Sequence, residues 1–93
     1  MIVGLLTLRM VFRESHSLKD KRHFLRSLKD RIKNEFNASV AEVGEQDHLQ
    51  LAEIACAMVG TERRGIESTL GEIRKKARYF SGGEVIGEEV EYF

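Results

Sequence analysis

Residues 2–12, IVGLLTLRMVF, are almost continuously apolar, and the polar run Arg13–His16 follows them directly. A short apolar run bounded by polar residues is typical of a largely buried β-strand. A second apolar run, residues 50–59 (QLAEIACAMV), has no helical polar face and ends before Gly60. We therefore predict a strand there too, although its alanines also suit a helix.

The two runs fit each other as antiparallel neighbours when the numbers of paired residues sum to 62. In that register the small Gly4 lies opposite the large Met58, and Leu6 lies opposite Cys56. Alternate residues of a strand point to opposite faces of a sheet. We predict that the face bearing Leu6 and Cys56 lies under helices.

A helix follows the first strand. Ser17 and Asp20 have the spacing of a capping box, with Asp in place of the usual Glu, and apolar residues continue at helical spacing to Phe36. We expect Asn37 to close this helix in a left-handed conformation, and residues 38–43 to form a short strand.

A second helix is predicted to start at a Thr61 cap and to run to about Tyr79, with Gly82-Gly83 breaking the chain before a last strand over residues 84–93. The order β-α-β-β-α-β is that of the ferredoxin-like plait, an α+β fold. We therefore predict a four-stranded antiparallel sheet of order 4-1-3-2, with two helices on one face and crossovers of the usual right hand.

The composition fits one cytoplasmic globular domain over residues 1–93. Lysine and arginine total 15 and aspartate and glutamate total 15, so a uniformly basic polyanion binder is excluded. No segment approaches the roughly 20 apolar residues of a membrane span. The single Cys56 leaves no internal disulfide to form and argues against a structural zinc site.

The sheet face opposite the helices carries apolar side chains that nothing in the fold covers. Such a patch is typical of an interface, which favours a homodimer through the open sheet face. The alternative is that an antiparallel sheet tolerates some outward apolar groups. The candidate interface residues are Val3, Leu5, Arg9, Leu51, Glu53, Ala57 and Val59.

Charge is distributed unevenly despite the zero total. Residues 13–36 hold eight basic and four acidic side chains, whereas residues 81–93 hold four acidic and no basic ones. The antiparallel helices of a plait are expected to bring the start of the first beside the end of the second, creating a basic end suited to phosphate. The alternative is an ordinary solvated helix face. The candidate nucleic-acid-binding residues are His16, Ser17, Lys19, Lys21, Arg22, Arg26, Arg74, Lys75 and Arg78.

Catalysis finds little support in the sequence. His16, His23 and His48 are scattered, and Cys56 is predicted to be a small core residue rather than a nucleophile. We expect no enzyme activity, cofactor, metal site or small-molecule substrate. We expect His48 to lie exposed in a turn over residues 44–48, either free in solvent or in contact with a partner.

The block His16–Arg22, HSLKDKR, together with residues 36–43 (FNASVAEV) and 59–64 (VGTERR), resembles the YlxP family of small bacterial proteins of unknown function. The resemblance covers nearly the whole chain. It implies a ferredoxin-like fold and, from the family's usual gene neighbourhood beside translation and ribosome-binding genes, a role near RNA or the ribosome. The family's basic block maps onto His16, Ser17, Lys19, Lys21 and Arg22.

The sequence therefore predicts a non-catalytic module that docks on RNA or a ribosomal particle through phosphate contacts. The alternative is a homo-oligomeric adaptor whose basic helices meet an acidic protein surface.

Overall fold

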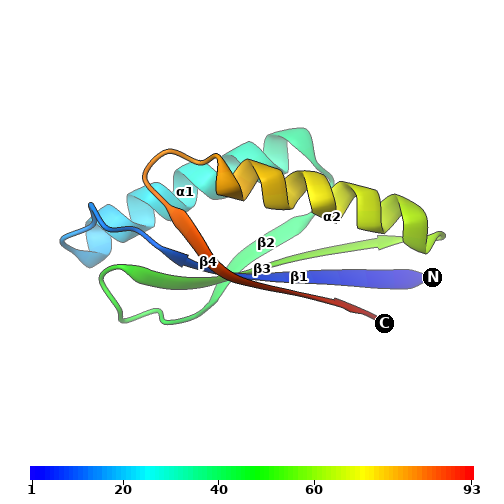
Figure 1. Cartoon of the computed structure of the whole chain (residues 1–93), viewed down its shortest axis with the longest axis horizontal. Coiled ribbons are helices and arrows are strands. Elements are labelled where there is room, and N and C mark those ends of the chain that lie inside the picture. Colours follow the sequence, from blue (N-terminus) through cyan, green and yellow to red (C-terminus); the bar gives the residue numbers. More distant parts are fainter.

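The computed structural model describes residues 1–93, and its elements follow the predicted order (Figure 1). They are β1 Ile2–Val11, α1 Leu18–Glu35, β2 Ser39–Gly44, β3 Leu51–Gly60, α2 Arg63–Arg78 and β4 Glu84–Tyr92. The strands form one antiparallel sheet of order β2-β3-β1-β4, with both helices on the same side. This is the predicted ferredoxin-like plait. No helix is long and apolar enough to cross a membrane.

The pairing of β1 with β3 has the predicted register, from Ile2 opposite Gly60 to Val11 opposite Leu51. Leu6 and Cys56 are fully buried beneath the helices, as expected. The alternation of buried and open positions along both strands therefore sets which face becomes the core.

Two local expectations at helix ends are wrong. Asn37 is not left-handed, because α1 ends at Glu35 and the chain turns extended at Phe36. Phe36 and Ala38 both pack against the core, which requires this extended path. Thr61 does not cap α2 either: Glu62 occupies the cap position and makes no side-chain hydrogen bond there.

The two helices are staggered along the sheet rather than aligned end to end (Figure 1). Lys76 in the last turn of α2 forms an ion pair with Glu35 at the end of α1, and Arg31 of α1 lies over the Phe80 ring. Arg22 precedes Glu35 by 13 residues, about 20 Å along a helix. The start of α1 and the end of α2 therefore do not form a common basic end, and this prediction is wrong.

Gly4 allows α2 to approach β1 closely. A Cβ at this position would collide with Ile66 of α2 and lie 3.1 Å from Leu70. By contrast, a Cβ at Gly71, on the same helix, would meet nothing within 4 Å.

The two glycines should therefore respond oppositely to alanine. Gly4→Ala should lower the free energy of unfolding by about 1–3 kcal/mol through overpacking. Gly71→Ala should raise it by about 0.5–1 kcal/mol, because alanine favours a helix interior. Urea unfolding of the two variants measures both effects, and a stability unchanged by Gly4→Ala would contradict the close contact.

Candidate phosphate-binding surface

Lys21 belongs to the basic block of α1, yet its side chain is only 1% exposed. Its ammonium donates to the backbone carbonyls of Glu45, at 2.8 Å, Leu51, at 3.0 Å, and Gln46, at 3.5 Å. The Glu42 Oε2 atom lies 3.0 Å from the same nitrogen, without the alignment of a hydrogen bond. Lys21 therefore holds the β2–β3 hairpin against α1, and its assignment to phosphate binding is corrected.

Further hydrogen bonds join the β1–α1 loop to the same hairpin. The buried Ser15 hydroxyl donates to the Leu49 carbonyl at 2.6 Å, and the Gln50 amide donates to the carbonyls of Arg13 and Ser15. The two loops thus form one connected unit at the end of the molecule opposite the chain termini (Figure 1).

The anion site expected at the start of α1 is filled by the chain itself. The Ser17 hydroxyl accepts from the Asp20 N–H, which confirms the predicted cap at Ser17. The Asp20 carboxylate accepts from the His16 N–H, one residue before the Ser17 N–H that a complete capping box uses. The Asp20 carboxylate repels a phosphate at this helix end. Ser17 and the backbone of His16 therefore serve the cap.

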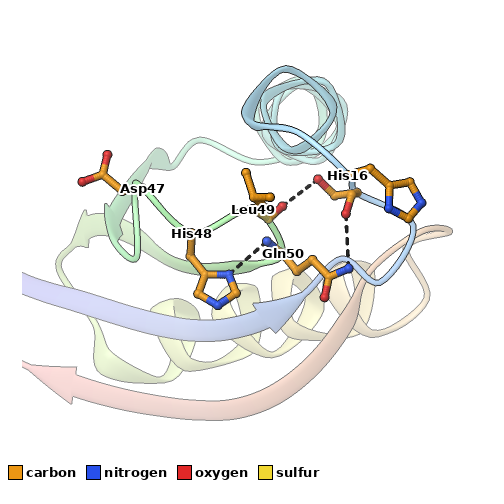
Figure 2. A pocket seen from close by; sticks show the side chains of 6 residues that line it. His16, Asp47, His48, Leu49 and Gln50 are labelled. Atoms are coloured by element: carbon orange, nitrogen blue, oxygen red, sulfur yellow. Dashed lines mark hydrogen bonds between the residues drawn. The ribbon is translucent and has the colours of Figure 1, made fainter.

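An open pocket of about 490 Å³ lies between the joined loops, lined among others by His16, Asp47 and His48. Figure 2 shows these three side chains pointing in different directions rather than toward one point. His48 is exposed, as expected, but it is not free. Its Nδ1 accepts from the N–H groups of Gln50 and Leu51, each at 3.0 Å. The role of His48 in this geometry is to order the hairpin turn.

The basic residues at the end of α2 are engaged with carboxylates. Arg74 and Arg78 both contact Glu88 of β4, at 3.3 and 3.1 Å, and Lys75 contacts Glu72. The two pairs with Glu88 join α2 to the edge strand, whereas the pair of Lys75 with Glu72 lies within α2. The single Glu88 carboxylate offsets one of the two arginine charges.

Six cations of α1 form no ion pair, and five of them, all except Arg31, lie along one flank of the helix. They occur at alternating spacings of three and four residues. This spacing places them within an arc of about 80° around the helix axis and spreads them over about 21 Å along it. Glu35 and Arg31 mark the flank that faces α2, and Lys33 lines a pocket with Ser39 of β2. The basic stripe, as we call it, therefore faces outward above β2. It consists of Lys19, Arg22, Arg26, Lys29 and Lys33.

Lys19, Arg22 and Arg26 were among the predicted residues, whereas Lys29 and Lys33 were missed. Their spacing is visible in the sequence once the whole helix is considered instead of its first turns. Which flank faces outward depends on tertiary contacts and needs the structure.

The open face of the sheet carries the predicted apolar residues. Val3, Leu5, Leu51 and Ala57 are partly exposed, and Val59 is 64% exposed. Arg9 and Glu53 are opposite each other in the register but form no ion pair, since neither takes part in any salt bridge.

Cys56 is fully buried in the core, as predicted. Burial raises the pKa of its thiol from 9.0 to about 11, because the apolar surroundings disfavour the thiolate. The thiolate is the reactive form, so folding suppresses its nucleophilicity.

Iodoacetamide at pH 8 should label native Cys56 at least about 100-fold more slowly than the urea-unfolded chain, because the two-unit pKa shift and burial both act. Since folding raises this pKa, stability should also fall as the pH increases above about 9. Rapid labelling without urea would contradict the buried placement.

Comparison with known proteins identifies the family. A family model described as "Protein of unknown function (DUF503)" matches residues 3–90, from β1 into β4. The chain belongs to the DUF503 family. It is 31% identical over 72 residues to "Uncharacterized protein YlxP" of Bacillus subtilis (strain 168), covering 77% of this chain and 78% of the relative. The resemblance to the YlxP family is confirmed.

Two designed proteins share the fold of this DUF503 chain. "De novo designed protein Foldit4" matches with a TM-score of 0.57 and 16% identity, covering all of this chain and 97% of the designed one. "De novo designed protein Ferredog-Diesel" matches with a TM-score of 0.51 and 14% identity, covering 96% and 83%. At these identities the likeness concerns the fold alone.

Proposed function

We propose that this protein is a non-catalytic, cytoplasmic module that binds the phosphate backbone of structured RNA through the basic stripe of α1. The observation that supports the proposal is the stripe itself: five cations on one outward flank, none of them engaged by a carboxylate. The overall charge is zero, so attraction to RNA has to be local to this flank.

The helix supplies a firm platform for these cations. Lys21 ties its first turns to the hairpin, and Leu25, Leu28 and Ile32 are buried against the sheet. Five cations held along about 21 Å match a ligand with regularly spaced negative charges better than a single small anion. Double-stranded RNA is bound mainly by its shape and phosphates.

Base stacking is not part of the proposed mode. The two central strands contain no aromatic residue on which bases could stack. Binding should therefore depend strongly on salt and weakly on RNA sequence. If all five cations contact phosphates, raising the salt concentration from 50 to 200 mM should weaken binding by about 500-fold.

A matched pair of double variants tests the location of the site, with a fluorescent 20-base-pair RNA duplex as the probe. Arg22→Gln with Arg26→Gln should reduce the salt slope of log K by about two, because two unpaired cations are lost. Arg74→Gln with Arg78→Gln should leave the slope unchanged, because those arginines are held by Glu88.

If the two double variants showed the same salt slope of log K, the proposed location of the site would be wrong. A wild-type protein that does not bind the duplex at 50 mM salt would overturn RNA binding, and would favour an acidic protein surface as the partner of the stripe. Circular dichroism of each variant serves as the folding control.

A further inference from the structure

The side of the sheet opposite the helices is uncovered, and both chain termini lie at one end of it (Figure 1). Exposed apolar side chains gather at that end. Val59, Val3 and Phe93 lie in one row across β3, β1 and the end of β4, because Val3 pairs with Val59 and exchanges two backbone hydrogen bonds of 2.8 Å with Phe93. Val59 is 64% exposed and Phe93 is 68% exposed. Ala57 and Leu5 form the next row inward.

Further along the same face, Arg9 and Glu53 diverge although they are register partners. The stem of Arg9 lies 3.7–3.9 Å from where a Cβ of Gly87 would be, on the β4 side. The carboxylate of Glu53 lies 2.5 Å from where a Cβ of Gly44 would be, on the β2 side. The Arg9 side chain therefore extends over Gly87 of β4, and the Glu53 side chain extends over Gly44 of β2. Neither glycine has a side chain that would block this position.

We propose that this face binds a second copy of the chain, about a two-fold axis that runs parallel to the strands between β1 and β3. Rotation about that axis places β3 of one copy over β1 of the other at the same level. Arg9 of each copy then lies over Glu53 of the other. The same rotation stacks Val3 on Val59, so the apolar ends cover each other.

The charges of β4 distinguish this axis from the alternative that runs across the strands. The alternative axis places β4 of one copy over β4 of the other. The exposed Glu89 and Glu91 side chains of the two copies then face each other and repel. The proposed axis places them instead over the β2 strand of the second copy, whose open face carries Ser39 and Ala41. Charge complementarity therefore favours the axis between β1 and β3.

The size of the face is sufficient for a dimer that dissociates on dilution. Four strands about 4.8 Å apart and about ten residues long present a flat area of about 600 Å². Standard stable interfaces bury about 800 Å² on each partner, so the proposed one lies at the small end. The mass must therefore be measured over a concentration series.

Sedimentation equilibrium of the wild type should give a mass rising toward twice 10.6 kDa as the concentration increases through the micromolar range. Arg9→Glu alone and Glu53→Arg alone should each remain monomeric, because each places like charges over one another. An equimolar mixture of the two variants should regain the dimer mass. In the mixed pair, as in the wild type, an acidic side chain of one copy meets a basic side chain of the other at both sites.

Arg64→Glu is the matched control, since Arg64 is exposed on α2 and forms no ion pair, and it should dimerise like the wild type. A monomeric wild type at 200 μM would overturn the proposal. A mixture that stays monomeric while the wild type dimerises would overturn the axis. Neither result bears on the salt slope of RNA binding, so the two proposals can fail separately.

Discussion

Burial of the Lys21 ammonium is the constraint on which one half of this structure depends. A buried lysine is costly unless its protons and charge are matched, and here three carbonyls and the Glu42 carboxylate supply the match. All these partners lie on β2, β3 or the turn between them, so a single side chain fixes the position of the hairpin relative to α1. The contacts of Ser15 and Gln50 then join the preceding loop to the same unit.

This arrangement separates two roles within one run of basic residues. Lys21 points into the protein, whereas Lys19 and Arg22, its close neighbours in the sequence, point outward on the flank that faces away from α2. At the other helix, Glu88 and Glu72 hold the basic residues of the last turns. Ion pairing thus determines which of the 15 basic residues remain for a partner, and it leaves them concentrated on α1.

The fold could be predicted because its signals are local or pairwise. The continuous apolar run of residues 2–12, the cap at Ser17 and the fit of Gly4 to Met58 each depend on a few residues. They give the elements and the central register, and the usual topology of a plait supplies the strand order. The site could be predicted only in part. A lysine in HSLKDKR reads the same in the sequence whether its side chain is solvated or buried. The partners that surround the buried Lys21 ammonium come from residues 21 to 30 positions away. The stagger of the helices, which separates Arg22 from Arg78, likewise arises from packing and not from spacing in the sequence.

The most direct test of this account compares Lys21→Met with Lys19→Met by urea unfolding and by amide hydrogen exchange of the hairpin turn. The account predicts that Lys21→Met lowers the free energy of unfolding by about 3 kcal/mol, because Glu42 loses its buried counter-charge, and that protection is lost over residues 44–51. Lys19→Met should change the free energy by no more than about 0.5 kcal/mol. Equal, small effects of the two substitutions would show that Lys21 is an ordinary surface lysine and would contradict the account.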